Sequence, residues 1–158
     1  MLDFVLFGFV FLVLFMVVLS SGGTSKNSAS DKHDAVLTVV GDNLAAFKSS
    51  AGTYEYRYDD LKGLAGNRPK GAEYFGPTLK EVLTSAGLGT YSGLLLYSAG
   101  SKKVQKLLSK DDVSGWIVAI EKREKPLSWK DDGPYLLYKE SEKDKMKYVP
   151  RLLRIEAK

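Results

Sequence analysis

Residues 63–71 (GLAGNRPKG) hold the side chains of this chain that are best suited to binding an anion. Arg68 and Lys70 stand in this segment among three glycines and a proline. A guanidinium group binds carboxylate or phosphate through paired N–H donors, and backbone N–H groups in a glycine-rich turn can add to such a site. Glycine and proline also suffice to form a plain turn. The sequence therefore leaves two readings open: an ordinary loop, or an anion contact through Arg68 and Lys70.

Catalytic and metal-binding chemistry has few candidate residues in this sequence. Cysteine is absent, which excludes thiolate nucleophiles and thiolate metal ligands, and His33 is the only histidine. The paired acids at 59–60 and 111–112 lack the regular rhythm of oxygen ligands that a calcium site needs, and such residues commonly cap turns. We therefore expect no catalytic residue, no metal ligand and no cofactor.

Three lysines and one tryptophan are the residues of the domain that we expect to contact a partner or a membrane. Lys102, Lys103 and Lys106 form a basic stretch. Such a stretch is typical either of a solvated strand edge that resists unwanted pairing or of a patch that contacts phosphate or lipid headgroups. Trp129 lies in the polar segment SWKDDG and is the better candidate for a contact, whereas Trp116 lies inside an apolar run and is expected in the core.

The elements that position these residues are predicted to be mostly strands. Hydrophobic patterns predict strands at residues 35–40, 53–58, 93–97, 102–108, 116–120, 135–138 and 149–155. Val104 and Leu107 are expected to point inward from their strand. Glycine, proline and aspartate predict turns at residues 41–43, 125–127 and 131–134. The resulting fold class is α+β, mostly β.

One helix is clearly indicated. It begins at Pro77 or Thr78 and ends at Ala86, with apolar residues recurring on one face. Thr78 and Glu81 have the spacing of a capping box, in which each side chain accepts a backbone hydrogen bond from the other residue. Gly87 suits the position just after a helix, where the backbone often turns left-handed. These signals agree on both ends of the helix.

The first part of the chain is strongly apolar. Residues 4–19 (FVLFGFVFLVLFMVVL) contain no polar side chain. As a helix this run would be roughly 24 Å long, close to the ~30 Å hydrocarbon core of a bilayer. We expect an N-terminal transmembrane anchor helix over residues 1–22, in which Phe4, Phe7, Phe11 and Phe15 contact lipid or a neighbouring membrane helix.

A cleaved signal peptide is the alternative interpretation of the apolar run. The small residues at 20–22 would tolerate cleavage, but no basic residue precedes the run, as a signal peptide usually requires. A flexible linker is predicted for residues 23–34 and a single domain for residues 35–158. All 23 basic residues and 18 of the 19 acidic residues follow the apolar run, a net charge of +5. This mild excess slightly favours anionic lipid or an acidic protein over nucleic acid.

Five segments of the domain resemble, in order, the molybdopterin-binding domain of the sulfite oxidase family, especially its short single-domain members. They are VLTVVG (36–41), YDDLKGL (58–64), YFGPTLKEVLTSAGL (74–88), KPLSWKDDGPYLLY (125–138) and RLLRIEAK (151–158). The third segment resembles the family's glycine-to-helix motif and is the strongest of the five. The resemblance implies a compact, largely β domain that is exported from the cytoplasm.

This chain departs from the family at the metal ligand. Catalytic members hold molybdenum through a cysteine in a motif resembling Cys-Ala-Gly-Asn-Arg. Here Ala65, Gly66, Asn67 and Arg68 match the last four positions, and Leu64 stands where the cysteine would be. The segment between this motif and the helix is also much shorter than in the catalytic proteins. Without a thiolate we expect neither molybdenum nor a pterin.

The sequence thus favours a non-catalytic, membrane-anchored accessory or assembly subunit of a membrane protein complex. Its expected partners are membrane lipid and other membrane-protein subunits, with no role in binding nucleic acid. The resemblance further implies a single-pass protein with an extracytoplasmic (periplasmic) domain, although Lys26 and Lys32 after the apolar run weakly favour the opposite orientation. An extracytoplasmic ligand-binding or sensing module is the main alternative, and a molybdopterin-dependent oxidoreductase is a further one.

Overall fold

The structure is a computed structural model, and it describes residues 34–42, 44, 52–130, 132–139 and 147–158. The predicted anchor helix, with Phe4, Phe7, Phe11 and Phe15, and nearly all of the predicted linker lie outside these residues. Within the described part of the chain, no helix is both long enough and apolar enough to cross a membrane.

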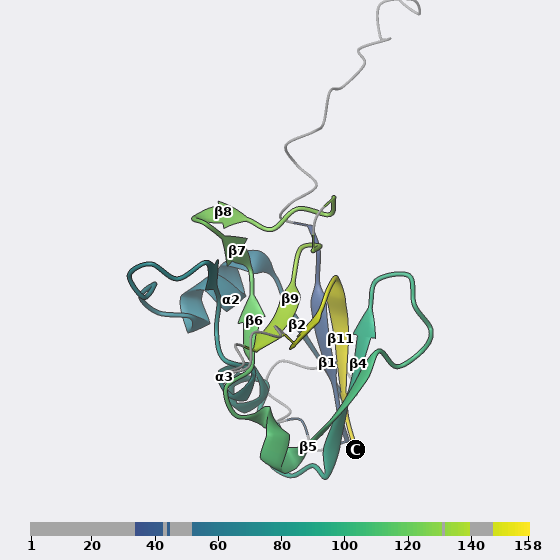
Figure 1. The fold of residues 1–158 in the computed structure, drawn as a ribbon. Helices are drawn as coiled ribbons and strands as arrows, with labels where there is room; N and C mark the ends of the chain where they lie inside the picture. Colours follow the sequence, from purple (N-terminus) through teal and green to yellow (C-terminus); the bar gives the residue numbers. More distant parts are fainter. Residues whose placement is uncertain (1–33, 43, 45–51, 131, 140–146) are drawn as a thin grey trace, which may run out of the picture.

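A five-stranded sheet forms one side of the domain (Figure 1). Its first and last strands in the chain, β1 and β11, pair in parallel, and all its other neighbours are antiparallel. In spatial order the strands are β2 (Thr53–Tyr56), β1 (Leu37–Val40), β11 (Leu152–Ala157), β4 (Gly93–Ser98) and β5 (Lys106–Ser109). The sheet therefore joins segments from both ends of the domain.

Two small three-stranded sheets complete the fold. One contains β10 (Lys147–Val149), β9 (Leu136–Lys139) and β6 (Ile117–Ala119), and the other contains β3 (Tyr74–Phe75), β7 (Glu121–Lys122) and β8 (Lys125–Pro126). Directly after β3, the backbone of Gly76 lies against the backbone of β6. A Cβ atom there would lie 1.9 Å from the carbonyl oxygen of Val118, so only glycine fits.

Two short helices and a 3₁₀ turn lie among the strands: α2 (Tyr58–Leu64), α3 (Leu79–Ser85) and η1 (Lys110–Val113). The capping box of α3 is confirmed. Thr78 Oγ1 accepts from the Glu81 backbone N–H at 3.1 Å, and Glu81 Oε2 accepts from the Thr78 N–H at 2.7 Å. Gly87 adopts a left-handed backbone (φ 75°), as its position after the helix predicts.

The main core lies between these helices and the inner face of the five-stranded sheet. Figure 1 shows α2 and α3 on the same side of that sheet. Trp116 is 2% exposed and belongs to this core, which confirms its predicted place. A second small cluster joins the two minor sheets through Tyr74, Ala119, Leu127 and Leu136. The architecture is mixed, with strands predominating over helices, which confirms the predicted balance of elements.

The predicted strand 102–108 is wrong in its start and in its register. β5 begins only at Lys106, and its pairing with β4 directs Leu108 inward beside Leu94. Leu107 therefore points to the opposite face and is 65% exposed, and Val104 is 42% exposed in the preceding loop. The prediction that both residues point inward is wrong, because side chains alternate between the two faces of a strand and residues three positions apart lie on opposite faces.

Three other boundaries differ from the predictions. The segment 149–155 is divided by a turn at Arg151 (φ 53°), so β10 pairs with β9 while β11 enters the large sheet. The expected turn at 125–127 contains strand β8, and the chain reverses instead at Arg123 (φ 48°) and Glu124 (φ 65°). Tyr58 begins helix α2 and does not continue the strand of Tyr54 and Tyr56.

Candidate functional site

A buried carboxylate, Glu121, is the centre of the most polar cluster in the described domain. It lies on β7 and is 7% exposed. Its Oε1 accepts a short hydrogen bond from the Tyr58 hydroxyl and lies 3.1 Å from Lys62 Nζ. Its Oε2 lies 3.3 Å from Arg68 Nη2. Helix α2 supplies Tyr58 and Lys62, which are one turn apart, and the following loop supplies Arg68.

The ionisation of this cluster follows from its hydrogen bonds and charges. Burial alone would raise the pKa of Glu121, but hydrogen bonds from Tyr58 and Lys62 and the charges of Lys62 and Arg68 outweigh it, so the pKa is lowered. Burial, and then the hydrogen bond to Glu121, raises the pKa of Tyr58. The hydrogen bond to Glu121 raises the pKa of Lys62. At neutral pH the cluster is thus a carboxylate surrounded by three protonated donors.

Arg68 is engaged on several sides. Besides Glu121, it donates through Nη1 to the carbonyl oxygen of Ala72 at 3.1 Å, and its guanidinium lies 5.1 Å from the centre of the Phe75 ring. These contacts join the loop after α2 to β3 and β7. An anion approaching Arg68 would compete with a carboxylate that is already bound there. The predicted anion contact of Arg68 stays a prediction, and the geometry gives Arg68 a role in fixing the loop.

Lys70 lies apart from that cluster. It is exposed and lines a shallow hollow of about 530 Å³ together with Arg123 and Glu124. Arg123 pairs with Glu73 across this hollow, at 3.3 Å. Arg68 lines the same hollow, but its guanidinium is engaged by Glu121 and Ala72, so Lys70 and Arg68 do not form one common anion-binding point.

A larger hollow of about 730 Å³ lies beneath the loop between α2 and β3. Tyr74 and Tyr138 form part of its lining, with ring centres 4.9 Å apart and tilted planes. Glu73 and Glu81 also line it, but Glu81 is engaged in the cap of α3 and Glu73 pairs with Arg123. An aromatic wall beside carboxylates is suited to a small ligand with a flat apolar face.

The residues at the position of the family's metal ligand do not fit a molybdenum cofactor. Leu64, which the resemblance places at the cysteine, has a hydrocarbon side chain that packs against the main core. It offers no lone pair to a metal. Across the described residues, no group of three or more histidine, cysteine, aspartate or glutamate side chains is arranged to hold a metal ion.

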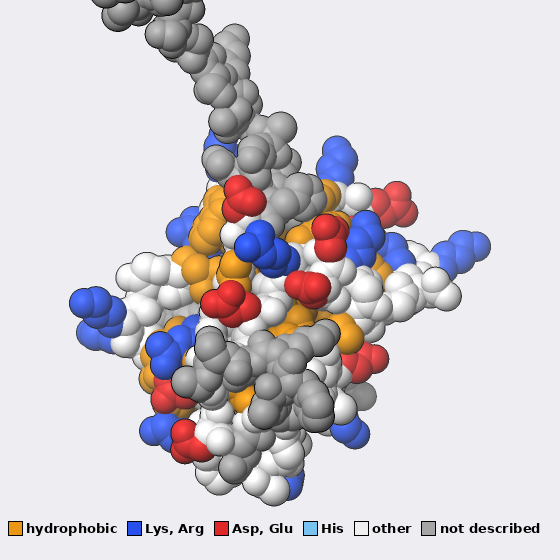
Figure 2. All heavy atoms as spheres, turned by 180° about the vertical axis from the view of Figure 1, so that it is seen from behind, with side chains coloured by type: hydrophobic (Ala, Val, Ile, Leu, Met, Phe, Trp, Pro, Cys, Tyr) orange, Lys and Arg blue, Asp and Glu red, His pale blue; other side chains and the backbone are white. Residues whose placement is uncertain are grey.

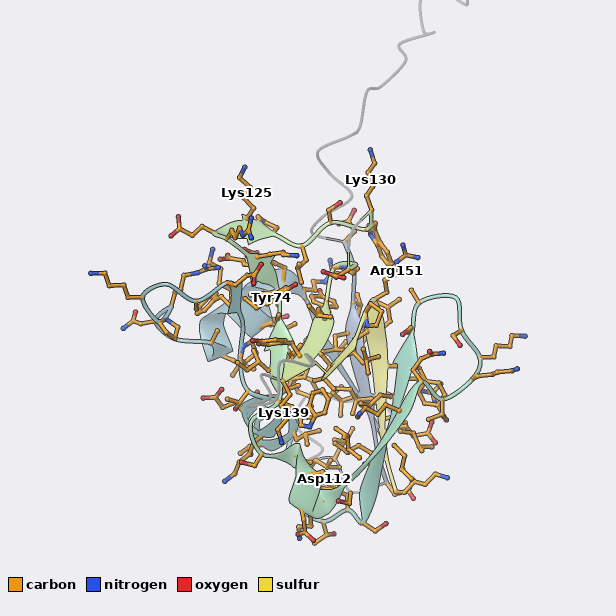
Figure 3. All side chains as sticks on the ribbon, viewed as in Figure 1. Tyr74, Asp112, Lys125, Lys130, Lys139 and Arg151 are labelled. Carbon is orange, nitrogen blue, oxygen red and sulfur yellow. The ribbon has the colours of Figure 1, made fainter. Side chains whose placement is uncertain are left out.

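The remaining predicted contact residues lie on two separate surfaces. Trp129, 38% exposed, lies in the segment between β8 and β9. Figure 3 shows Lys125 and Lys130 pointing outward at this end of the domain, with Asp112 at the opposite end. The turn is held by bonds from the Gly133 and Lys130 N–H groups to Ser128. Strand β1 starts at the same end (Figure 1), so this end is where the predicted linker would join the domain.

The second surface contains the predicted lysines. Lys102 and Lys103 are exposed in the loop between β4 and β5. Lys106 is only half-exposed, and its Nζ lies 5.0 Å from the centre of the Trp116 ring. Figure 2 shows acidic and basic side chains interspersed over the face turned away from the view of Figure 1, with hydrophobic groups between them.

No family model and no curated protein matches this chain. The likeness to sulfite oxidase-type domains consequently rests on the sequence segments alone.

The sequence did not single out Glu121. Its partners Tyr58 and Arg68 are 63 and 53 positions away in the chain, so no local pattern joins them. One signal was present: Tyr58 and Lys62 have the spacing of neighbours on a helix, and Glu121 follows an apolar strand directly.

Proposed function

We propose that this chain is a non-catalytic, membrane-anchored accessory or assembly subunit of a membrane protein complex, built on a degenerate molybdopterin-binding fold. The observation that carries the proposal is the 65% exposure of Leu107 on a regular strand. A single exposed apolar side chain is common on a monomeric protein, but Val104 is also exposed three positions earlier in the chain, and apolar groups that gather beside polar ones are typical of protein-binding surfaces. Val104 and Trp129 are the other large exposed apolar side chains among the described residues.

The state of Glu121 supports a structural role for the polar cluster. A general base works best with a pKa near the working pH, and buried catalytic carboxylates often have raised values. The pKa of Glu121 is lowered by its hydrogen bonds and by two cations, although burial opposes this. The carboxylate is therefore a poor proton acceptor and a good anchor for α2 and the loop of Arg68.

Leu64 supports the degenerate character of the site. The position that the resemblance assigns to the metal ligand carries here a leucine that is partly buried and packs against the core. Metal analysis of protein produced with the molybdenum cofactor present tests this point. Stoichiometric molybdenum or pterin would favour the oxidoreductase reading over the accessory role.

The proposed orientation of the domain at the membrane depends on which end of the domain the linker joins. A single-pass anchor at residues 1–22 and a linker at residues 23–34 would lead to the end of the domain that carries Lys130 and, next to it in the chain, Trp129. Tryptophan and lysine are common at the boundary between lipid and water. We propose that this end faces the membrane, on the extracytoplasmic (periplasmic) side, and that lipid and other membrane subunits are the partners.

Co-purification tests the accessory role. The full-length chain and a version lacking residues 1–23 are extracted in mild detergent and analysed for associated proteins and particle size. We expect the full-length chain in a discrete larger assembly with defined partners, and weaker or no recovery of those partners with the shortened version. A full-length chain that runs alone as a detergent-bound monomer under every mild condition would refute the proposal.

Ligand sensing is the second candidate, and the hollow of about 730 Å³ favours it. Its aromatic residues Tyr74 and Tyr138 could cover one face of a small molecule. Native mass spectrometry of protein isolated from its source would detect a retained ligand. A bound small molecule that is lost in a Tyr74→Ala variant, but retained in Tyr97→Ala, would move sensing ahead of the accessory role.

A further inference from the structure

Strand β5 is an outer strand of the five-stranded sheet. Among the described residues it pairs only with β4, so its other edge has no neighbouring strand there. In an antiparallel ladder alternate residues direct their backbone N–H and C=O groups toward each side. An outer strand therefore presents a row of backbone groups that can accept a further strand.

The side chains along this edge combine one sign of charge with apolar surface. From residue 99 to residue 110 the chain carries four lysines and no acidic residue. The two large apolar side chains that are most exposed in the described domain, Val104 and Leu107, lie in this same segment. The first acidic residues that follow are Asp111 and Asp112, and Asp112 accepts a hydrogen bond from Ser109 at 2.7 Å.

The loop that leads into β5 is held in shape by its own hydrogen bonds. Ser101 Oγ accepts from the Lys103 N–H at 3.2 Å and from Gln105 Nε2 at 2.8 Å. Gln105 N–H donates to the Leu96 carbonyl at 2.8 Å, which fixes the end of the loop against β4. Figure 1 shows this loop projecting from the edge of the large sheet. Its lysines are thus presented by an ordered turn, which lowers the entropic cost of binding.

The outer face beside β5 carries apolar groups that the side chains of an added strand could contact. Leu107 is 65% exposed there, and it is opposite Leu95, which is 9% exposed and belongs to neither core cluster. Further along the same face, a shallow hollow of about 470 Å³ is lined by Tyr97, Leu153 and Lys102, among others. An extended segment placed along β5 would direct every second side chain toward this face.

We propose that the free edge of β5 binds an extended, acidic segment of a partner protein by strand addition. Backbone hydrogen bonds supply the pairing, apolar side chains lie beside Leu107, and carboxylates face Lys102, Lys103 and Lys110. This inference rests on the accessory role and names the chemistry of the partner. A second copy of this chain does not fit, because pairing two β5 edges would bring eight lysines together without an acidic residue between residues 99 and 110.

The test measures binding of a defined peptide to the full-length chain in detergent. The probe is a fluorescent peptide of about eight residues in which valine alternates with glutamate, the length of a typical strand. Fluorescence anisotropy should show saturable binding that weakens as salt is added, because surface charges are screened. A peptide with lysine in place of glutamate should not bind.

Two double variants and one single variant distinguish binding at the β5 edge from binding elsewhere on the surface. The double variant Lys102→Glu with Lys103→Glu should weaken binding by about tenfold or more, since two attractive contacts become repulsive. The matched variant Lys80→Glu with Lys125→Glu makes the same charge change on exposed lysines elsewhere and should change affinity less than about threefold. Leu107→Ser should weaken binding several-fold while leaving the melting temperature unchanged.

Backbone methylation of the peptide tests strand addition itself. Methyl groups on one alternating set of peptide amides should abolish binding, whereas methyl groups on the other set should be tolerated. Equal binding of both methylated peptides, or equal loss in the two lysine double variants, would overturn the proposal. If the chain co-purifies with partners but fails these tests, the accessory role is supported and the proposed binding at the β5 edge is wrong. If the peptide binds as described and the chain still purifies alone, the edge is a binding site and the accessory role fails.

Discussion

The hydroxyl of Tyr58, the first residue of α2, donates a hydrogen bond to the buried carboxylate of Glu121 on β7, 63 positions later in the chain. Lys62 and Arg68 approach the same carboxylate from outside. This contact fixes the start of α2 against one of the small sheets. The same hydrogen bond raises the pKa of Tyr58 and lowers the pKa of Glu121, so it favours a neutral hydroxyl and a charged carboxylate.

Replacing Glu121 by Gln is expected to destabilise the domain. The amide keeps the size of the side chain but removes the charge that three donors share, and hydrogen bonds to a charged group typically contribute about 1.5–3 kcal/mol. Chemical denaturation of the wild type and the variant measures the difference. Glu55→Gln, on the exposed side of β2, is the control and should change the free energy of unfolding by less than about 0.5 kcal/mol. Equal stability of Glu121→Gln and wild type would show that the cluster contributes nothing.

The same cluster predicts a loss of stability in acid. The pKa of Glu121 is lowered from 4.5 in the folded domain, so its contribution is present above the unfolded value of 4.5 and is lost as the pH falls through the folded value. The wild type should therefore lose its advantage over Glu121→Gln in that range and not between neutral pH and about 5. Denaturation curves at several pH values measure this. A stability difference that is the same at all pH values would contradict the assigned ion pairs.

Tyr56 predicts a separate change in alkali. Burial raises the pKa of Tyr56 from 10.0 to about 12, and its hydroxyl donates to the Val82 carbonyl at 2.7 Å. A raised pKa stabilises the folded state below the unfolded value of 10.0, and this contribution is lost as the pH rises through about 12. Tyr56→Phe should cost about 0.5–1.5 kcal/mol at neutral pH, with the difference shrinking over that range. Tyr97→Phe, on the outer face, is the control, and a constant difference for Tyr56→Phe would oppose the prediction.

Trp129 is predicted to touch the membrane surface in the anchored protein. The full-length chain is placed in vesicles that contain brominated lipid, which quenches nearby tryptophan fluorescence. Trp129 should be quenched, because it is exposed at the end of the domain where the linker would join, whereas buried Trp116 should not. Trp129→Phe should remove the quenched component. If quenching persists in that variant or is absent in the wild type, this end of the domain does not face lipid.

The orientation of the chain can be tested with protease on sealed cells. We expect protease added outside to digest the domain and to leave a membrane-bound fragment that includes residues 1–22. The intact mass of the untreated protein should include those residues. Protection of the domain from external protease would place it on the cytoplasmic side, as Lys26 and Lys32 weakly suggest. A mass lower by the first 22 residues would identify the apolar run as a cleaved signal.

Local signals predict helix α3 correctly but fail at residues 125–127, where the expected turn contains β8, and contacts between distant segments leave no local pattern in the sequence. Helix α3 follows from Thr78, Glu81 and Gly87, which act within a few positions of one another. Strand β5 was misread because its register is set by pairing with β4, and long lysine side chains gave no clear alternation. The Glu121 cluster was missed because its members meet only after β7 folds beside α2.

The positions of the predicted contact residues relative to one another also depend on contacts between distant segments. Exposure of Trp129 agrees with its polar surroundings in the sequence, but its separation from Lys102 and Lys103 depends on the path of the chain. The half-buried place of Lys106 over Trp116 also depends on the fold, since it requires the start of β5 to lie beside the residue that precedes β6. Residue type indicated which side chains could make contacts, and the fold decided which of them lie on one surface.

The parallel pairing of β1 with β11 has a consequence for when this domain can fold during its synthesis. Val39 is opposite Ile155, and β11 lies between β1 and β4 near the middle of the sheet. A chain emerging from the ribosome must therefore be synthesised through residue 155 before this sheet can close. Such long-range pairing slows folding, because the entropic cost of closing a long loop is incurred before the contacts between its ends form. The order of strands thus makes the completion of the large sheet one of the last events in the synthesis of the domain.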